Sequence, residues 1–140
     1  MVNRLLAVGL RPISSIVDVT NYVMMDIGRP LHAYDVNKIN GNTLTVRISE
    51  KGERFNALNG KTYELDDSML VISDEKGVDD LAGIMGGSRT GVDQNTTEFF
   101  LEAAIFCPIS IAKTGRYLNI NSDARYRFER GLDFNSPEVG

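Results

Sequence analysis

The chain has 140 residues, of which 42% are hydrophobic and 24% charged, a composition typical of one soluble globular domain. Lys and Arg number 15 against 19 Asp and Glu, so the formal net charge is −4. This balance excludes a strongly basic protein that wraps nucleic acid by neutralising its phosphates, but it leaves room for a local basic patch.

The sequence predicts no metal site and no membrane span. One histidine and one cysteine cannot supply the roughly four nitrogen or sulfur ligands of a zinc site. No apolar run approaches the ~18–20 residues of a membrane-spanning helix, and no signal-peptide cleavage site follows the N-terminus. A single cysteine cannot form an internal disulfide, so we expect a cytoplasmic protein.

Helices are predicted at the N-terminus. The first ten residues are typical of the last turns of a short helix, which Gly9 caps. Ser14 or Ser15 can cap a second helix, and Gly28 ends it. Apolar residues recur at helical spacing and share one face of that helix: Ile16, Val19, Val23 and Ile27.

Strands are predicted in the middle of the chain, where the apolar period changes to two. Leu44, Val46 and Ile48 alternate with polar residues, which predicts a half-buried strand. Asn59-Gly60 suits a hairpin turn with positive φ at both central residues. Further apolar strands are expected at residues 69–72 and 99–106.

The fold class follows from the order of the elements. Pro108 fits the first position of a helix that Gly115 would weaken or end. Ser122 can cap a last helix that Gly131 stops. Strands and helices do not alternate strictly, and no linker divides the chain. We therefore predict one α+β domain over residues 1–140, with mixed or antiparallel sheets and flanking helices.

Single features that could carry chemistry are ambiguous. The glycine-rich residues 82–87 match neither a dinucleotide fingerprint nor a phosphate loop, and alone they favour a turn between strands over a ligand-binding backbone. His32 could contact a polar substrate or simply bond to the nearby Asp35. Glu102 interrupts an apolar strand, so it is either a buried carboxylate that needs a partner or an outward, solvated side chain.

Charged clusters are interpreted mainly as surface. The carboxylate pairs Asp66-Asp67 and Asp79-Asp80 match no calcium-binding loop, and we expect solvated turn residues there. The C-terminal part is basic and would form either a salt-bridged surface or a modest contact with nucleic-acid phosphates. Its cations are Arg116, Arg125, Arg127 and Arg130.

Taken in order, several blocks resemble one family. They are similar to the editing module, formed by the fused third and fourth structural modules, of bacterial phenylalanine–tRNA ligase beta subunits. The most specific blocks are RPISSIVDVTNYV at 11–23, GRPLHAYD at 28–35 and AGIMGG at 82–87. LEAAIF at 101–106 and the residues 122–124 and 127–133 follow in the family's order.

The resemblance implies a fold, an activity and partners. The fold would be a three-layer α+β domain, a sandwich of unusual topology. The activity would be hydrolysis of tyrosine misattached to the phenylalanine tRNA, in support of translational fidelity. Aminoacylation would lie elsewhere, so no cofactor is expected in this chain, and ATP and magnesium only for the rest of the ligase. Partners would be the mischarged tRNA, the remainder of the beta subunit and the alpha subunit, with no membrane.

The resemblance also implies a site. Glu102 should meet the phenol hydroxyl of tyrosine, while His32 and Asn21 should lie near the ester. His32 would act as a base or only orient water, and the ribose hydroxyl of the substrate could assist instead. Donors to the developing oxyanion would come from Asn21 or from glycine amides. The substrate-binding set would be Thr20, Gly83, Gly86, Gly87, Ala103, Ser122 and Ala124.

The chain departs from the family in two places. The family module runs longer at its N-terminal side, so we expect an excised fragment truncated there. Arg125 and Tyr126 stand where smaller or less charged residues are expected, which puts the local shape near Ala124 in question. The alternative function is a non-catalytic module that binds the tRNA end or has a structural role in the same synthetase, inactive as an isolated fragment.

Overall fold

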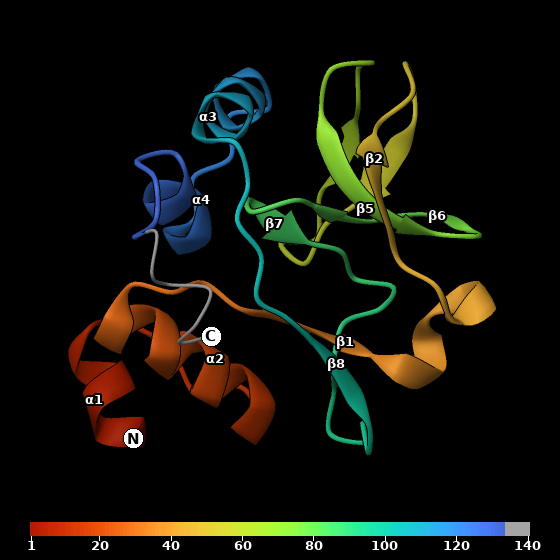
Figure 1. Ribbon diagram of the computed structural model, residues 1–140. Coiled ribbons are helices and arrows are strands. Elements are labelled where there is room, and N and C mark those ends of the chain that lie inside the picture. Colours follow the sequence, from red (N-terminus) through yellow and green to blue (C-terminus); the bar gives the residue numbers. More distant parts are fainter. Residues whose placement is uncertain (134–140) are drawn as a thin grey trace.

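The computed structural model describes residues 1–133 and contains helices and short strands (Figure 1). The helices are α1 (Val2–Ala7), α2 (Ser15–Ile27), α3 (Pro108–Tyr117) and α4 (Asp123–Phe128), with 3₁₀ turns at Val36–Lys38 and Asn40–Asn42. The strands are β1 (His32–Asp35), β2 (Thr45–Ile48), β3 (Arg54–Asn56), β4 (Thr62–Glu64), β5 (Leu70–Asp74), β6 (Gly77–Leu81), β7 (Met85–Gly86) and β8 (Phe99–Glu102).

Within the described part of the chain, the strands form three antiparallel sheets, which confirms the predicted α+β class. The largest has the order β2-β5-β6-β7, and the other two are the pairs β1-β8 and β3-β4. In Figure 1 the β1-β8 ribbon has α1 and α2 on one side, and the four-stranded sheet, α3 and α4 on the other. Because β1 and β8 come from distant parts of the chain, their pairing fixes the N-terminal helices to the rest.

Local capping signals predicted the helix ends correctly. The Ser14 side chain accepts a hydrogen bond from the Val17 N–H at 3.3 Å, and Gly28 ends α2 with a φ of 72°. Ser122 caps α4 in the same way, through the Arg125 N–H at 3.0 Å. Gly115 is an exception, because α3 continues through it to Tyr117; a Cβ there would lie 2.3 Å from Nε of Arg125.

The apolar face predicted for α2 is not its buried face. Val19 and Ile27 are about half exposed, at 49% and 51%, whereas Asp18, Thr20 and Met24 are buried. The polar members of this buried set are satisfied locally. The Asp18 carboxylate accepts from the Ile13 N–H at 2.8 Å, and the Thr20 hydroxyl donates to the Val17 carbonyl at 2.9 Å. Local hydrogen bonds therefore remove the usual cost of burying these groups.

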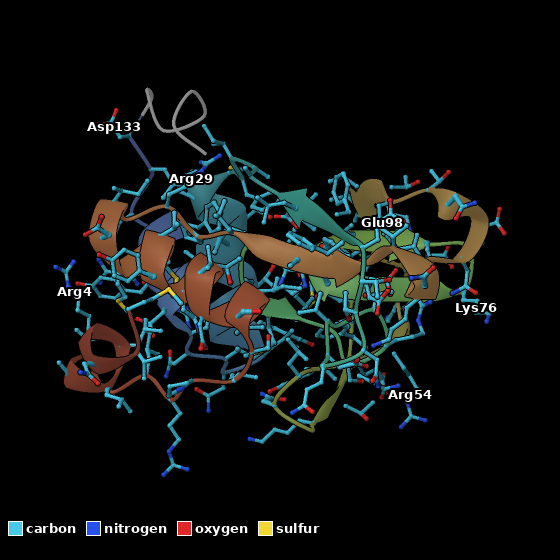
Figure 2. All side chains as sticks on the ribbon, turned by 90° about the horizontal axis from the view of Figure 1, so that it is seen from below. Arg4, Arg29, Arg54, Lys76, Glu98 and Asp133 are labelled. Atoms are coloured by element: carbon cyan, nitrogen blue, oxygen red, sulfur yellow. The ribbon has the colours of Figure 1, made fainter. Side chains whose placement is uncertain are left out.

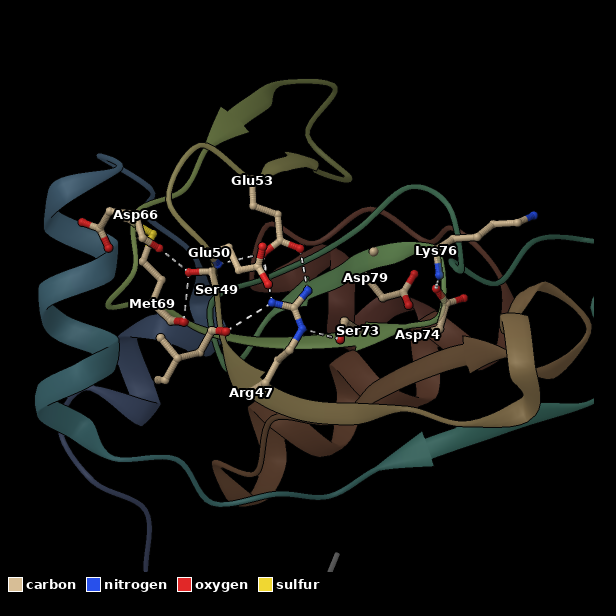
Figure 3. A network of polar contacts seen from close by, with 12 residues as sticks. Arg47, Ser49, Glu50, Glu53, Asp66, Met69, Ser73, Asp74, Lys76 and Asp79 are labelled. Carbon is tan, nitrogen blue, oxygen red and sulfur yellow. Dashed lines mark hydrogen bonds and ion pairs between the residues drawn. The ribbon is translucent and has the colours of Figure 1, made fainter.

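In strand β2, too, the apolar residues do not form the buried face that the sequence pattern predicted. Val46 and Ile48 are exposed, while the polar residue between them, Arg47, points into a network on the covered side (Figure 3). The Arg47 guanidinium donates to Glu53 at 2.9 Å and to the Ser73 hydroxyl at 2.9 Å. The partners supplied by other segments thus decide which side of the strand is covered.

The hairpin at Asn59-Gly60 has a longer loop than predicted. Asn56 of β3 pairs with Thr62 of β4, and only Gly60 of the two turn residues has a positive φ, at 78°. The Asn59 side chain instead accepts from the Lys61 N–H at 3.0 Å, so a side chain closes the turn.

The hydrophobic core lies where the sheets meet α3 and α4. Phe106 and Phe128 pack edge to face with ring centroids 5.2 Å apart. Gly83 allows this contact, because its φ is +70° and a Cβ there would lie 2.8 Å from the Phe106 ring. The core therefore continues directly into the wall of the pocket described next.

Candidate functional site

A pocket opens between β1, the end of β8, the β6–β7 turn and α4. Its lining combines apolar side chains with three polar ones, His32, Asp80 and Glu102. The full lining is Pro30, Leu31, His32, Asp80, Gly83, Ile84, Met85, Gly86, Glu102, Ala124 and Phe128. Five of the residues that the family resemblance singled out lie here together: His32, Gly83, Gly86, Glu102 and Ala124.

His32 and Glu102 are brought together by strand pairing. They are direct partners in the antiparallel β1-β8 ladder, so both side chains stand on the same side of the ribbon. In the sequence each was ambiguous; in the fold they form one polar edge of the pocket.

Glu102 is a partnered carboxylate. Its Oε2 accepts a hydrogen bond from the hydroxyl of Tyr34, a fully buried residue, at 2.8 Å. Burial raises the pKa of the Glu102 carboxyl above its usual range, while the Tyr34 hydrogen bond and the charge of Arg29 oppose that rise. A carboxylate has about four lone-pair sites, so a ligand hydroxyl can still find an acceptor on Glu102.

Asp79 and Asp80 are not the solvated turn residues that the sequence suggested. They lie in β6 and are 0% and 4% exposed. Burial is possible because other segments supply partners: Arg89 Nη2 lies 2.6 Å from Asp79 Oδ1, and Asp80 Oδ2 lies 3.6 Å from His32 Nε2. Burial raises the pKa of both carboxyls, that of Asp80 well above its usual range.

His32 is neutral at physiological pH. Burial lowers the pKa of its imidazole to about 4. The ring packs edge-on against Tyr34 with centroids 4.6 Å apart, and Nε2 is sealed from solvent without a hydrogen bond. Gly86 makes room for this ring.

Two predicted residues on α2 lie elsewhere. The hydroxyl of Thr20 is engaged with the Val17 carbonyl, and Thr20 lines a separate apolar groove between α2 and β8, together with Leu31 and Leu101. Asn21 is half-buried and does not line the pocket. Strand β1 therefore contributes to the pocket, whereas this part of α2 does not.

Three further predicted residues do not line the pocket. The Gly87 N–H donates to the Asp79 carbonyl at 2.7 Å, so this amide is not free for a ligand. Ala103 is exposed beyond the end of β8. The Ser122 hydroxyl donates to the Ile84 carbonyl at 2.6 Å while it caps α4, so Ser122 ties the pocket turn to that helix.

Arg125 does not distort the pocket, although the sequence raised that question. Its side chain turns away from Ala124 and donates to the Ile120 carbonyl at 2.6 Å and to Glu129 at 3.0 Å. Arg127 pairs with Asp123 at 3.1 Å, and Arg130 pairs with Glu129 at 3.1 Å. These pairs favour the salt-bridged interpretation of the basic C-terminal part.

Sequence reasoning missed Tyr34 and Arg29 as neighbours of Glu102. Arg29, labelled in Figure 2, follows the end of α2; it is 1% exposed, and its guanidinium nitrogens find no hydrogen-bond partner among residues 1–133. Its position between Gly28 and Pro30 indicated a helix stop and nothing more. Tyr34 carried a signal, because it lies two residues after His32 and so points to the same side of a strand.

Residues 1–133 present neither a cluster of metal ligands nor a membrane-spanning helix. No group of three or more His, Cys, Asp and Glu side chains is placed to hold a metal ion. No helix in this part of the chain is long and apolar enough to cross a membrane.

Comparison with known proteins gives consistent matches. A family model described as the B3/4 domain matches residues 1–140. The chain is 56% identical over 130 residues to the phenylalanine–tRNA ligase beta subunit of Bradyrhizobium diazoefficiens. These aligned residues make up 93% of the chain and 16% of that protein. It is 54% identical over 140 residues to the phenylalanine–tRNA ligase beta subunit of Bartonella henselae, and this alignment covers 100% of the chain and 17% of that protein. The chain thus spans about one sixth of the length of these relatives.

Proposed function

Since the chain belongs to the B3/4 domain family and its relatives are phenylalanine–tRNA ligase beta subunits, we propose that it is a tRNA-editing domain that hydrolyses tyrosine misattached to the phenylalanine tRNA. The observation that carries this proposal is the pocket itself. An apolar lining for an aromatic ring, formed in part by Leu31, Ile84 and Phe128, meets a half-buried carboxylate, Glu102, that can accept a phenol hydrogen bond.

The chemistry of discrimination favours a site of this kind. Tyrosine and phenylalanine differ by one hydroxyl, and an apolar pocket alone rejects such an addition by only about a hundredfold. A site built to bond the hydroxyl discriminates better, because phenylalanine would leave the acceptor that Glu102 offers to the ligand unfilled. Glu102 would supply that acceptor, and Gly83 and Ala124 would be part of the wall around the ring.

The hydrolytic step needs a positioned water and stabilisation of the developing oxyanion. A histidine with a pKa near 4 is a weak base at pH 7, so His32 would orient water or ester rather than remove a proton. The ribose hydroxyl of the substrate would then assist the attack. No step in this scheme uses a metal, ATP or a protein nucleophile.

The proposed partners follow from the relatives. Within the ligase the domain would act on the acylated end of the phenylalanine tRNA and would pack against the remainder of the beta subunit and the alpha subunit. The paired arginines and the net charge of −4 predict weak, salt-sensitive tRNA binding by the domain itself.

The proposal is tested with two substrates. The ligase that contains this chain is incubated with phenylalanine tRNA charged with tyrosine or with phenylalanine, and loss of each ester is followed. We expect fast loss of the tyrosine ester and slow loss of the phenylalanine ester. Loss of both esters at the spontaneous rate, with tRNA still bound, would instead support the non-catalytic binding module.

A further inference from the structure

Asp80 is a buried carboxyl in the pocket to which the family resemblance assigns no role. It lies in β6 opposite Gly86 of β7, is 4% exposed and lines the pocket. Its Oδ2 is 3.6 Å from Nε2 of His32, a nitrogen that is buried and has no hydrogen-bond partner within the described part of the chain. This spacing is slightly longer than a hydrogen bond, and such contacts often shorten when a substrate binds.

The charges around Asp80 are unevenly compensated. Asp79, its neighbour in β6, pairs with Arg89 at 2.6 Å. Glu102, from β8, accepts from Tyr34 of β1 and lies in the field of Arg29. Among residues 1–133, no Lys or Arg forms an ion pair with Asp80, and its only basic neighbour is His32. An ionised Asp80 would therefore add an uncompensated negative charge beside Glu102.

The protonation directions agree with this geometry. Burial, followed by the charges of Glu102 and Asp79, raises the pKa of Asp80, and the Tyr34 hydroxyl opposes the rise only in part. Burial lowers the pKa of His32 to about 4. Burial thus favours the neutral form of both groups, which is the protonated carboxyl for Asp80 and the uncharged imidazole for His32.

We infer that Asp80 is a positioning residue that directs its own carboxyl proton to His32 Nε2 and so fixes the His32 tautomer with its hydrogen on Nδ1. A neutral imidazole carries one N–H, so an Nε2 that accepts a hydrogen bond requires the hydrogen on Nδ1. The Cε1–Nε2 edge of the ring faces Gly86 and Asp80, and the side chain as a whole is 23% exposed.

The tautomer decides what His32 offers to a substrate. With hydrogen on Nδ1, His32 offers a substrate an N–H donor, suited to an ester oxygen or a ribose hydroxyl, and no free lone pair that could take a proton from water. This catalytic consequence rests on the proposed editing function, whereas the tautomer itself does not.

The tautomer is measurable because His32 is the only histidine of the chain. Long-range ¹H–¹⁵N correlation spectra at pH 7 distinguish the ring nitrogens, since Nε2 couples to both ring protons. We expect Nε2 to resonate as the unprotonated nitrogen and Nδ1 as the protonated one. In the full ligase, the signal lost in His32→Gln identifies the same ring. A protonated Nε2 at pH 7 would overturn the inference.

Two substitutions assign the effect to Asp80. Asp80→Asn keeps the shape and an N–H donor, so we expect the Nδ1–H tautomer and the deacylation rate to be retained. Asp80→Ala removes the donor, and we expect a tautomer mixture with about a tenfold loss of deacylation. A near-ultraviolet circular dichroism spectrum checks that each variant is folded. If Asp80→Ala unfolds, the ¹H–¹⁵N correlation spectrum of Asp80→Asn alone still tests whether residue 80 sets the His32 tautomer.

The outcomes separate the two proposals. A wild-type Nδ1–H tautomer with no hydrolysis of the tyrosine ester would contradict the editing function and leave the Asp80 assignment standing. An unchanged tautomer in folded Asp80→Ala, or conversion to Nε2–H in Asp80→Asn, would remove Asp80 from the positioning role. Neither of these last two results depends on enzymatic activity.

Discussion

Gly86 leaves the space that the His32 imidazole fills. A Cβ on Gly86 would lie 2.4 Å from Cε1 of His32, closer than non-bonded carbon atoms approach, and 3.0 Å from its Nε2. The φ of Gly86 is not in the left-handed region, so the constraint at this position is contact and not backbone conformation. The glycine-rich turn therefore shapes the pocket through the histidine.

We expect Gly86→Ala to push His32 out of its place and to lower tyrosine-ester deacylation at least tenfold. Overpacking of this kind costs about 1–3 kcal/mol of folding stability. Gly91→Ala is the matched control, because its Cβ would meet its nearest neighbour at an ordinary 3.4 Å. Deacylation rates and thermal unfolding of both variants check the prediction; equal rates for the two would contradict it.

Glu102→Ala is predicted to remove discrimination before it affects folding. A charge-assisted hydrogen bond to the substrate phenol is worth about 1.5–3 kcal/mol, equivalent to a roughly ten- to hundredfold change in the ratio of tyrosine-ester to phenylalanine-ester deacylation. Glu98→Gln, an exposed carboxylate labelled in Figure 2, is the control. If the ratio stays unchanged in folded Glu102→Ala, the phenol must have another partner.

Tyr34→Phe is expected to shift the pH dependence of the site. The Tyr34 hydroxyl stabilises the ionised form of Glu102 and lowers its pKa, so its loss raises that pKa. The acid side of the deacylation profile should then move to higher pH. Tyr63→Phe is the control, since its hydroxyl accepts only from Asn59. A profile that coincides with wild type would show that ionised Glu102 is not required.

Arg89→Met should destabilise the fold in a pH-dependent manner. Arg89 bonds both oxygens of Asp74 at 2.7 Å and lies 2.6 Å from Asp79, and both carboxylates have side chains that are 0% exposed. Leaving these charges unpaired costs about 3 kcal/mol or more at pH 7.

The loss of stability in Arg89→Met depends on pH through the carboxyl of Asp74. In wild type the hydrogen bonds from Arg89 and Asn40 outweigh burial and hold the pKa of Asp74 below its usual range, so their contribution to stability is lost as pH falls. Without Arg89 burial prevails, the folded pKa values rise, and the deficit should shrink as pH falls from 7 to 4. Urea unfolding at both pH values measures it, with Arg130→Met as control; a deficit that grows at pH 4 would refute it.

Sequence predicted those features that depend on neighbouring residues. The caps at Ser14, Gly28 and Ser122 depend on bonds within a few residues, and all three formed as expected. Which face of β2 is covered, and whether Asp80 is buried, depends on partners from distant segments. At both places the local sequence pattern gave a wrong prediction. An acidic residue followed by Leu81 looks the same in sequence whether or not a distant side chain will cover it.

The candidate site shows the same division. His32 and Glu102 were separate, ambiguous features until the family resemblance put them in one site, and their strand pairing gives a physical reason for the proximity. The roles assigned to them stay predictions. The hydrogen bond between Tyr34 and Glu102 had no sequence signature of its own, because it spans 68 positions.

That separation has a consequence for folding kinetics. The β1-β8 ladder must close a loop of this length before His32 and Glu102 can form the polar edge of the pocket. Helix α4 must then pack in place to complete the pocket lining. Loop closure is entropically costly before its contacts form, so such pairings slow folding. During synthesis, the His32 side of the pocket leaves the ribosome well before its partner strand, and the site is completed only after α4 emerges.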